Sequence, residues 1–349
     1  MDHWWVVMSE RVLVAMSGGV DSSATAALLI EQGYDVTGVT LKLWGGEQDS
    51  GCCSLSDVED ARRVAAQLGI AHYVFNYTEE FEQNVVNPYV ESYIAGNTPN
   101  PCVECNRHLK FGRLLERADA LGFEKVATGH HARVRKNNDA FELWRGVDTH
   151  KDQSYVLYML GQNELRRIML PVGEMTKTEV RGHAARLGLR TATKSESMDV
   201  CFIKKGGREE FIRARSPLEP GVIVDAEGEL LATHSGTSSF TIGQRRGLGL
   251  SAEDRRYVTD IDASTKTVTI GSKEDLLCDE ITARDWCFVD EIPSPHHVIT
   301  AQMRAHSTPV ECTLDGATVR FATPQTRVAP GQVVALYDND RLLGGGLAI

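Results

Sequence analysis

Apolar and polar positions in the first two hundred residues of the chain alternate between two periods. Short apolar runs at 11–16, 35–43 and 71–76 predict strands, and the patterns at 22–32 and 57–68 predict helices. Strands that alternate with helices are typical of a parallel sheet covered by helices on both faces. We therefore expect an α/β fold in the N-terminal part.

Residues that begin and end helices agree with this pattern. Ser56 with Glu59, and Thr176 with Glu179, have the spacing of capping boxes at the start of helices. Glycine commonly ends a helix in a left-handed conformation. Glycines follow the helical patterns at Gly33, Gly69 and Gly122.

After about residue 210 the pattern changes to β-branched runs divided by Asp-Gly and Asp-Asn turns. These runs predict strands at 221–224, 265–270, 317–321 and 332–337. We expect one or two small antiparallel β units, with candidate boundaries at 217–220 and 272–279.

The composition narrows the class of protein. With 42% hydrophobic and 24% charged residues, and no apolar run near the roughly 20 residues of a membrane span, we expect neither a disordered nor a membrane protein. The net charge of -11 argues against nonspecific coating of nucleic acid, although a local basic face stays open. Eight cysteines and no secretory signal predict a reducing, cytoplasmic setting.

The segment Ser17-Gly18-Gly19-Val20-Asp21-Ser22-Ser23 joins the first predicted strand to the first predicted helix. Two glycines allow a sharp turn with inward N–H groups, and the helix N-terminus adds positive potential, so the segment suits an anion. The lysine of a GxxxxGK[ST] loop and the GxGxxG pattern are both absent. A glycine turn with a serine cap is the structural alternative.

SGGVDSS resembles the pyrophosphatase loop of the N-type ATP pyrophosphatases, which cleave ATP to AMP and pyrophosphate and adenylate a substrate oxygen. This resemblance predicts ATP and Mg²⁺ as cofactors. Asp21 would position magnesium or phosphate, because hard oxygen ligands suit that ion. An acidic N-cap is the alternative role for Asp21.

Three cysteines stand in polar or proline-rich contexts. Residues 98–106 contain Cys102 and Cys105, and two prolines predict a loop too rigid to be helical, followed by a helix near 110–121. Cys201 stands where a polar stretch runs into an apolar one, so we expect it at the entrance to a strand. Cys278, Cys287 and Cys312 lie in β-rich segments and are interpreted as small buried hydrophobic residues.

Sulfur transfer requires one thiol that carries a persulfide and a second thiolate that resolves the resulting disulfide. Cys105 and Cys201 could supply both. Structural zinc lacks a second CxxC or CxxH to complete four ligands. An iron-sulfur cluster, such as a 4Fe-4S cluster held by Cys102, Cys105 and Cys201, stays open as an alternative.

Further along the chain, more motifs occur in a fixed order. With SGGVDSS, the chain resembles the tRNA-specific 2-thiouridylases over nearly its whole length through NPCVECN, ATGHHAR (127–133), KDQSYVL (151–157), DVCFI (199–203), GQRRGLG (243–249) and LGGG (343–346). The resemblance implies a parallel-sheet N-type ATP pyrophosphatase domain at 1–210, a small central domain at 211–275 and a C-terminal β-barrel at 276–349. It also implies that the C2 oxygen of a wobble uridine is adenylated and replaced by sulfur, giving 2-thiouridine.

By motif match, the resemblance assigns roles to individual residues. Cys105 would be the nucleophile and Cys201 the persulfide carrier, and the two could form a disulfide between turnovers. ATP would contact Ala15, Met16, Ser17, Gly18, Gly19, Val20, Asp21, Ser22, Leu41 and Gly129.

The resemblance also implies macromolecular partners. These are the anticodon loop of tRNA and an upstream sulfur donor, either a cysteine desulfurase or a relay protein. Asn100, Pro101 and Cys102 would approach the target base. Other tRNA contacts would come from His130, Lys151, Asp152, Gln153, Arg304 and Gln332.

Two positions depart from the family pattern. Many members carry Asp at the position of Cys102, where it is the usual candidate for proton transfer at the base. A thiol with a pKa of about 8.5 is a poorer base at neutral pH, whereas a cluster ligand is an obvious use for it. The Arg-Tyr pair of the barrel is Arg304-Ala305 here, so aromatic stacking is lost.

Two other functions stay open from the sequence. The first is another N-type pyrophosphatase, such as an amidotransferase-type synthetase, which has no need of Cys105 and Cys201. The second is a non-catalytic cysteine-cluster RNA-binding module in which SGGVDSS is structural. Pyrophosphate release upon addition of ATP and tRNA distinguishes an enzyme from such a module.

Overall fold

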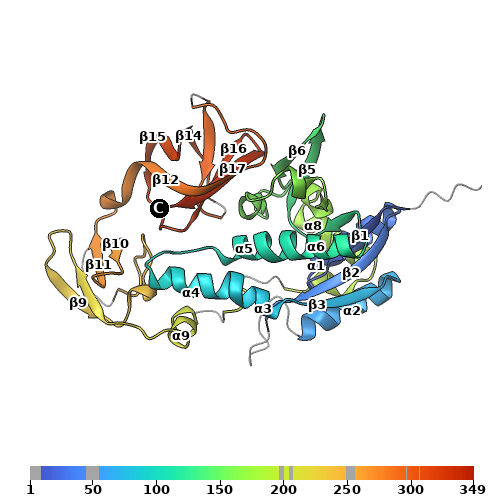
Figure 1. Cartoon of the computed structure of the whole chain (residues 1–349), viewed down its shortest axis with the longest axis horizontal. Coiled ribbons are helices and arrows are strands. Elements are labelled where there is room, and N and C mark those ends of the chain that lie inside the picture. The colour runs from blue at the N-terminus through green and yellow to red at the C-terminus, as the bar shows by residue number, and fades with distance from the viewer. Residues whose placement is uncertain are drawn as a thin grey trace, which may run out of the picture.

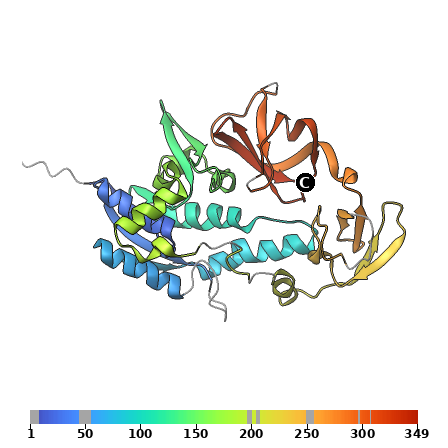
Figure 2. The same cartoon turned by 180° about the vertical axis from the view of Figure 1, so that it is seen from behind.

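The computed structural model describes residues 9–44, 55–195, 200–203, 207–248, 256–295, 297–305 and 307–349. The molecule is elongated, with a parallel sheet at one end and a small β unit at the other (Figure 1). A C-terminal barrel lies above the helices that connect these ends, and the view from behind shows the same arrangement (Figure 2). Cys52 and Cys53 lie outside the described residues.

The N-terminal sheet has five parallel strands in the spatial order β3-β2-β1-β4-β7. The predicted strands are confirmed within one or two residues. The strands are β1 (Arg11–Ala15), β2 (Asp35–Lys42), β3 (His72–Asn76), β4 (Lys125–Ala127) and β7 (Ile168–Met169).

Alternate residues of β1 enter different cores, because side chains of a strand point to opposite faces of the sheet. Val12 and Val14 pack on one face and Leu13 on the other. The first face is covered by α1 (Val20–Glu31), α2 (Leu55–Leu68) and α8 (Lys177–Arg186). The second is covered by α3 (Thr78–Phe81), η1 (Glu82–Val86), α4 (Asn87–Ile94), α5 (Pro101–Glu104), η2 (Cys105–Arg113) and α6 (Leu114–Ala120).

The predicted helix ends have mixed outcomes. Gly33, Gly69 and Gly122 follow α1, α2 and α6 with positive φ, as expected. Thr176 and Glu179 form a capping box at the start of α8. Ser56 is the second residue of α2 as described, so the helix does not begin after Ser56 and that prediction is wrong.

The prediction of a rigid loop around Cys102 and Cys105 is also wrong. Pro101 begins α5, and the helix continues through wider π-type turns in η2 into α6. Proline is tolerated in the first helical turn because its missing N–H would have no intrahelical partner there. The Asn100 side chain accepts the Cys102 N–H at 3.1 Å and caps this helix.

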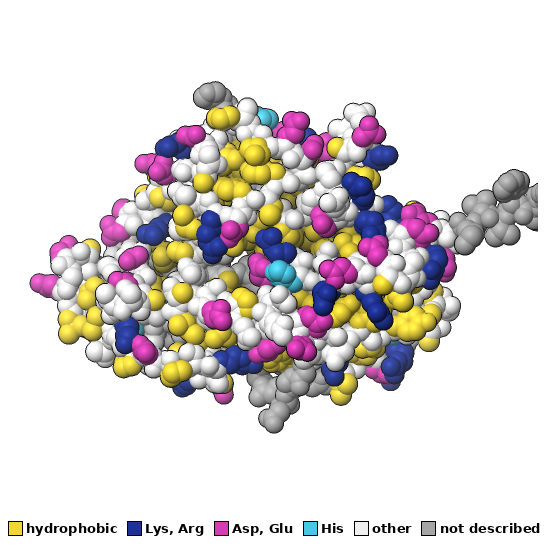
Figure 3. Space-filling view, in the orientation of Figure 1, with side chains coloured by type: hydrophobic (Ala, Val, Ile, Leu, Met, Phe, Trp, Pro, Cys, Tyr) yellow, Lys and Arg dark blue, Asp and Glu magenta, His cyan; other side chains and the backbone are white. Residues whose placement is uncertain are grey.

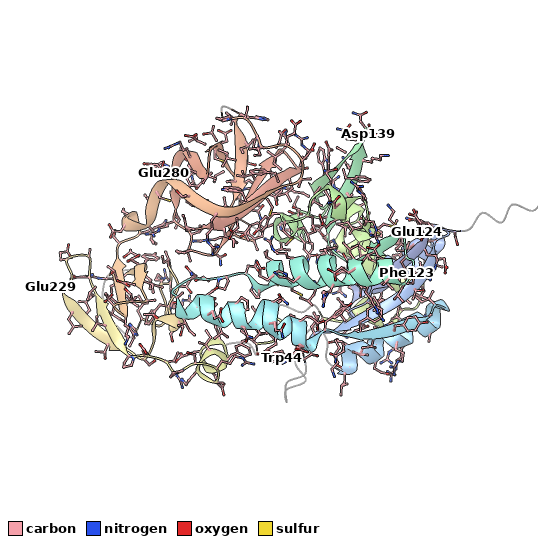
Figure 4. The ribbon with its side chains drawn as sticks, viewed as in Figure 1. Trp44, Phe123, Glu124, Asp139, Glu229 and Glu280 are labelled. Atoms are coloured by element: carbon pink, nitrogen blue, oxygen red, sulfur yellow. The ribbon has the colours of Figure 1, made fainter. Side chains whose placement is uncertain are left out.

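The C-terminal strands form a closed six-stranded barrel, because β12 pairs with both β15 and β17. Its strands are β12 (Leu277–Phe288), β13 (Ile299–Gln302), β14 (Val310–Asp315), β15 (Thr318–Thr326), β16 (Val333–Asp338) and β17 (Arg341–Ala348). A hairpin of the N-terminal part, β5 (Ala132–Asn137) and β6 (Ala140–Arg145), extends the same sheet. Trp144 pairs with Arg341 of β17, and Asp139 lies at the hairpin tip (Figure 4).

The small β unit is a four-stranded sheet in the order β10-β11-β8-β9. Its strands are β8 (Gly221–Val224), β9 (Leu230–His234), β10 (Tyr257–Asp262) and β11 (Thr267–Gly271). The expected antiparallel pairing is correct except between β11 and β8, which run parallel. Glu229 marks the outer end of the β8–β9 hairpin (Figure 4).

Short helical segments connect these parts. They are α7 (Gln162–Leu165), α9 (Arg208–Arg213), η3 (Ser154–Leu157), η4 (Pro171–Glu174), η5 (Arg190–Thr193), η6 (Thr237–Ser239) and η7 (Glu274–Leu276). Of the helices in the described ranges, none is long and apolar enough to cross a membrane.

Candidate functional site

The phosphate-binding loop predicted from SGGVDSS lies at the carboxyl end of β1, next to the carboxyl end of β4. The chain order of the strands reverses direction between these two neighbours. In open α/β sheets, ligands bind at this kind of crevice. The fold therefore places the loop where a nucleotide is expected.

Hydrogen bonds within the loop hold its curvature. The Ser22 hydroxyl accepts the N–H of Ser17 at 3.1 Å and donates to the Gly19 carbonyl at 3.2 Å. The Ser23 hydroxyl donates to the same carbonyl at 2.8 Å. Two of the three serine hydroxyls of the loop, those of Ser22 and Ser23, therefore bond the loop backbone and have a structural role.

Gly18 is required for two reasons. Its φ of +72° is in the left-handed region, where a side chain is strained. A Cβ atom there would also lie 2.2 Å from the Asp57 carbonyl oxygen of α2. The loop is thus packed directly against the first turn of that helix.

Asp21, in the first turn of α1, lies at the centre of a charged group. Lys177 Nζ contacts its Oδ1 at 2.8 Å and its Oδ2 at 2.7 Å, and His131 Nε2 lies 3.1 Å from Oδ1. Burial alone would raise the pKa of Asp21, but the hydrogen bonds from His131 and Lys177, with the lysine charge, hold that pKa below its usual value. The carboxylate is therefore ionised at neutral pH.

Sequence reasoning missed Lys177 and assigned no role to His131. One signal for Lys177 was readable. It is the first residue of α8 after the Thr176 cap, and a cation at the positive end of a helix dipole is unfavourable without an anion nearby. Asp21 is that anion.

The segment after β4 brings Gly129 and two histidines to the loop. A Cβ atom on Gly129 would lie 2.7 Å from the Ser22 nitrogen, so only glycine lets this segment approach α1. His130 is buried, and its Nδ1 lies 2.7 Å from the Thr128 hydroxyl. Burial, aided by the Lys110 charge, lowers the pKa of His130 well below 6.5.

Met16 and Leu41 fix the edge of the crevice on the β2 side. The Met16 N–H donates to the Val39 carbonyl at 2.7 Å, and its own carbonyl accepts from the Thr40 hydroxyl at 2.7 Å. Leu41 is buried in β2. These contacts hold β1 and β2 in register at the point where the loop begins.

Cys102 and Cys105 lie one helical turn apart and differ in exposure. Cys102 is exposed and Cys105 is buried within the largest core cluster. Asn106, the next residue, donates to the Val156 carbonyl at 3.0 Å and ties the helix to η3. The helix therefore shelters Cys105 and presents Cys102 at its start.

Cys201 is partly buried and packs against the same core cluster as Cys105. The prediction that it enters a strand is wrong, because residues 201–203 form a turn and the next described element is α9. Residues 196–199, which include part of DVCFI, lie outside the described residues.

Phe202, the neighbour of Cys201, is anchored among other aromatic rings. It packs against Phe81, Tyr89 and Phe211 at ring distances of 5.5, 5.4 and 5.3 Å. Trp44 adds a fourth contact at 6.0 Å and lies beside α3 (Figure 4). Burial of this ring fixes the backbone next to Cys201.

No group of three or more His, Cys, Asp or Glu side chains in the described ranges is placed to hold a metal ion. The cluster alternative with Cys102, Cys105 and Cys201 thus has no preformed ligand set in this conformation. Mg²⁺ commonly binds through one or two carboxylates together with substrate phosphates. Asp21 fits such a role only by sharing its oxygens with Lys177.

Lys151, Asp152 and Gln153 precede η3 at the base of the β5–β6 hairpin. The Asp152 side chain is 5% exposed, and its carboxylate accepts from the backbone N–H of Gly146 at 3.0 Å and from Arg145 at 2.9 Å. The Gln153 side chain accepts the N–H of His131 at 3.0 Å. Asp152 therefore organises this segment through hydrogen bonds within the protein, and Lys151 beside it is half-buried.

The segment before α5 docks on the C-terminal barrel. Thr98 N–H donates to the Pro330 carbonyl at 2.7 Å, and the Gln332 side chain donates to the Thr98 carbonyl. Gln332 thus lies beside Thr98, two residues before the Asn100 to Cys102 segment, although the two are far apart in sequence. Arg304 is exposed on the barrel, near the Gly243 turn of the small β unit.

Charged side chains on the face in Figure 3 are of both signs and interspersed. Hydrophobic side chains gather on the upper part of this face, over the C-terminal strands. Recognition of a nucleic acid on this face would depend on the placement of individual cations, in keeping with the net charge of -11.

Comparison with known proteins gives consistent matches over the whole chain. The tRNA methyl transferase HUP domain profile matches residues 10–205, the tRNA methyl transferase PRC-barrel domain profile 209–272, and the aminomethyltransferase beta-barrel domain profile 278–348. Among solved structures, a 4-thiouridine synthetase–RNA complex with bound ATP aligns with 55% of this chain and 44% of that chain, at 16% identity. The TM-score of this alignment is 0.39.

Curated relatives are much closer. The tRNA-specific 2-thiouridylase MnmA of Chloroflexus aurantiacus is 47% identical over 96% of this chain and 97% of its own length. The protein of the same name from Carboxydothermus hydrogenoformans is 46% identical over 98% of both chains. With the fold and the loop geometry described above, these matches show that the chain belongs to the tRNA-specific 2-thiouridylase family.

Proposed function

We propose that this chain is a tRNA-uridine 2-sulfurtransferase. It adenylates the C2 oxygen of a wobble uridine with ATP and replaces that oxygen by sulfur from a cysteine persulfide. The products are 2-thiouridine, AMP and pyrophosphate. One observation carries the proposal: Cys105 and Cys201 pack in the same core cluster, which also contains Leu13 of β1, and β1 leads directly into the SGGVDSS loop with its Asp21–Lys177 pair.

The ATP step uses the loop at the carboxyl end of β1. Backbone N–H groups and the N-terminus of α1 attract the phosphates. Lys177 contacts the Asp21 carboxylate and brings positive charge to the same place, and His131 Nε2 lies 3.1 Å from the same carboxylate. The uridine O2 attacks the α-phosphorus, and pyrophosphate leaves. Contacts to ATP are proposed for Ala15 to Ser22, Leu41 and Gly129.

The sulfur step uses two thiols. The terminal sulfur of a Cys201 persulfide attacks C2 of the adenylated uridine, and AMP leaves with the former O2. The base is then joined to Cys201 through a disulfide. The Cys105 thiolate attacks the Cys201 sulfur, which releases 2-thiouridine and leaves a Cys105–Cys201 disulfide for an external dithiol to reduce.

Mg²⁺ would enter with the nucleotide. Asp21 is the carboxylate in place to share it, and the ion would neutralise the phosphate charge during adenylation. The loop backbone, Lys177 and His131 add hydrogen bonds in the same part of the site.

The tRNA would be held by residues from several parts of the molecule. Asn100, Pro101 and Cys102, at the start of α5, would face the target base. Lys151 and Gln153 at the base of the hairpin, and Arg304 and Gln332 of the barrel, would supply further contacts, and Gln332 already hydrogen-bonds the Thr98 carbonyl near the start of α5. His130 would contact the tRNA as a neutral side chain. For Asp152, whose carboxylate is engaged within the protein, we propose an indirect role through Lys151 and Gln153.

We also propose a persulfide donor as partner, either a cysteine desulfurase or a relay protein. Persulfide chemistry requires reduced thiols, which persist in the cytoplasm, and we place the enzyme there. The domain limits of 1–210, 211–275 and 276–349 are part of the same proposal.

The test is a single-turnover assay with ATP, substrate tRNA and a cysteine desulfurase supplied with cysteine. Pyrophosphate and 2-thiouridine are quantified together in the wild type, Cys105→Ala and Cys201→Ala. We expect both variants to release pyrophosphate and bind tRNA but to form no 2-thiouridine. Full thiolation in both variants would refute sulfur transfer through Cys105 and Cys201. Absence of pyrophosphate release in the wild type would refute the proposed enzymatic activity.

Cys102 separates the relay from cluster chemistry. The protein is purified anaerobically, its iron and sulfide are measured, and Cys102→Ala is assayed beside the wild type. Active, iron-free protein with a persulfide donor supports the relay. Activity that requires iron and is lost in Cys102→Ala would instead establish the cluster.

A further inference from the structure

A tight turn in the small β unit carries two exposed arginines, Arg245 and Arg246. The Gln244 side chain accepts the Thr241 N–H at 3.0 Å and donates to the Arg246 carbonyl at 2.9 Å, so it spans the turn from within. The Val258 N–H of β10 donates to the Gln244 carbonyl at 2.9 Å. The backbone that carries both arginines is therefore fixed to the sheet.

A third arginine comes to this turn from the barrel. Arg304 is exposed, and its Nη2 lies 3.8 Å from the position that a Cβ atom on Gly243 would occupy. The Arg304 carbonyl accepts from the Gln302 side chain at 3.1 Å and from the Ser307 hydroxyl at 3.0 Å, which fix its backbone. Two parts of the molecule thus bring three arginines to one turn.

These three arginines form no ion pair with a carboxylate in the part of the chain that the structure describes. Other exposed arginines do, for example Arg186 with Glu31 and Arg213 with Glu209. The chain as a whole carries a net charge of -11, so a group of three such arginines departs from its overall balance. Positive charge that is not offset by a neighbouring carboxylate attracts anions.

A small apolar cluster fixes the turn relative to the barrel. Ile242 of the turn is buried with Leu276 and Ala329, and Tyr257 and Ile261 of β10 pack against them. Leu276 immediately precedes β12, and Ala329 lies between β15 and β16. The place of the arginines beside the barrel is therefore set by packing as well as by the turn itself.

The segment before α5 runs along the same junction, where the small β unit meets the barrel (Figure 1). A Cβ atom on Gly96 would lie 3.3 Å from Ile261 Cγ2, and the Thr98 N–H donates to the carbonyl of Pro330, the neighbour of Ala329. Cys102 follows Thr98 by four residues, a span of at most about 14 Å when extended. Contacts between described residues thus connect the arginine turn to the proposed approach of the target base.

We propose that Arg245 and Arg246, together with Arg304, bind the phosphate backbone of the tRNA beside the nucleotide that enters the site. A guanidinium suits this role, because its planar set of N–H donors holds two phosphate oxygens at once. Contacts to phosphate position an RNA without reading its bases. The inference rests on the function proposed above and gives Arg245 and Arg246 a part in it.

The experiment measures the dissociation constant of the substrate tRNA by filter binding between about 50 and 200 mM salt. In the double variant Arg245→Gln, Arg246→Gln we expect the dissociation constant to rise roughly tenfold. The slope of its logarithm against the logarithm of the salt concentration should fall by about 1.5, because each lost phosphate contact removes about 0.7 to 0.9. An unchanged slope would overturn the proposal.

A matched control removes the same charge elsewhere. Arg62 and Arg63 are neighbouring arginines of α2 with side chains 63% and 51% exposed, and Glu59 contacts both. Arg62→Gln with Arg63→Gln should keep the dissociation constant within about twofold of the wild type and leave the slope unchanged. An equal loss of slope in the two double variants would assign the effect to net charge and overturn the proposal.

A second variant keeps both charges at the turn. Arg245→Lys with Arg246→Lys retains the attraction to phosphate but loses the paired donors. We expect it to keep most of the slope and to weaken binding less than the glutamine variant does. A lysine variant as weak as the glutamine variant, with the same loss of slope, would count against phosphate contacts.

An acidic surface of the persulfide donor is the competing partner for these arginines. Persulfide transfer from a cysteine desulfurase to the enzyme is therefore measured without tRNA, and the glutamine variant should match the wild type. Slower transfer together with unchanged tRNA binding would identify a protein-docking site and overturn the RNA assignment.

The kinetics separate this proposal from the function beneath it. At saturating tRNA the glutamine variant should form 2-thiouridine at close to the wild-type rate, and its KM for ATP should be unchanged. If the wild type forms neither pyrophosphate nor 2-thiouridine, the proposed function fails. If the wild type forms both and the glutamine variant binds tRNA as the wild type does, only the phosphate contacts of Arg245 and Arg246 fail.

Discussion

The ammonium of Lys177 lies 2.8 and 2.7 Å from the two carboxylate oxygens of Asp21, although 156 residues separate the two in sequence. Each member occupies the first turn of its helix, so the pair brings two helix N-termini to one loop. The lysine offsets a carboxylate that would otherwise repel phosphate. The pair therefore makes an acidic loop compatible with an anionic ligand.

Replacement of this lysine should introduce a pH dependence. In the wild type, burial raises the pKa of Asp21, and His131 and Lys177 more than reverse that effect. In Lys177→Met the hydrogen bonds and charge of the lysine are lost, so they no longer lower the pKa of Asp21. The carboxyl therefore takes up a proton at higher pH than in the wild type. We expect the KM for ATP of this variant to fall as the pH is lowered from 8 to 5, because the neutral carboxyl no longer repels phosphate.

The double variant Asp21→Asn, Lys177→Met isolates the source of that change. It lacks the titrating carboxyl and should show the pH profile of the wild type, which is measured by initial rates of pyrophosphate release. If the KM for ATP of Lys177→Met changes with pH in the same way as that of the double variant, the pH dependence does not come from Asp21.

His130 should make the protein less stable in mild acid. Its pKa is well below 6.5 in the folded state, chiefly through burial, and near 6.5 in the unfolded chain. Below pH 6.5 the unfolded state binds a proton that the folded state does not, so stability falls as pH falls, by up to about 1.4 kcal/mol per pH unit. His130→Asn removes this contribution. The difference in the free energy of unfolding between the wild type and this variant should therefore be smaller at low pH than at neutral pH.

Denaturant unfolding of both proteins at pH 7.5 and 5.5 measures the difference. The comparison is between two proteins at each pH, so the histidines that both retain, such as His72 and His234, largely cancel. An equal gap between His130→Asn and the wild type at the two pH values would show that His130 titrates normally in the fold.

The parallel sheet and the phosphate loop could be predicted because local signals carry them. Apolar period, a glycine pair and a following helix are all encoded within about twenty residues, and β1, β2 and β3 appear within one residue or so of the expected limits. The error at residues 98–106 was also local. Proline was interpreted as excluding a helix, but Asn100 and Pro101 together form a helix start.

Other features depend on contacts that the sequence does not announce. The hairpin of residues 132–145 joins the barrel through Trp144 and Arg341, which are about two hundred residues apart. Likewise Gln332 reaches the Thr98 carbonyl, and Lys177 reaches Asp21. Such pairings follow from tertiary packing and not from any local period, so composition and spacing could not reveal them.

Replacement of Phe202 should slow sulfur transfer more than adenylation. Its ring fills a space among Phe81, Tyr89 and Phe211, and Phe202→Ala would leave a cavity that costs on the order of 3–5 kcal/mol. With Cys201 next to it, we expect the rate of 2-thiouridine formation to fall at least about tenfold while pyrophosphate release changes less. Phe202→Leu keeps most of the volume and should retain most of the thiolation rate.

The comparison uses thiolation and pyrophosphate rates below the unfolding temperature of each variant. Leu231, a partly exposed apolar residue of β9, provides a control, and Leu231→Ala should leave both rates unchanged. A proportional loss of both rates in Phe202→Ala would indicate general destabilisation instead of a displaced Cys201.

Arg145 should hold the N-terminal hairpin to the barrel. Its guanidinium contacts Asp152 at 2.9 Å and Gln302 at 2.6 Å and lies 3.6 Å from the ring centroid of Tyr337. Arginine and aspartate are 11% and 5% exposed, so Arg145→Met leaves a buried carboxylate without its cation. We expect a loss of about 3–5 kcal/mol in the free energy of unfolding.

A double-mutant cycle apportions this loss. Adding Asp152→Asn removes the uncompensated charge and should recover part of the stability, since breaking one partner of a buried pair costs more than removing both.

Arg135 stacks on Trp144 at 4.9 Å in the same hairpin but is exposed, so Arg135→Met should change stability by less than about 0.5 kcal/mol. Because the barrel carries Arg304 and Gln332, Arg145→Met should also weaken tRNA binding in a filter assay while leaving the KM for ATP unchanged. Equal stability losses in the Arg145 and Arg135 variants would mean that the buried pair does not hold the two parts together.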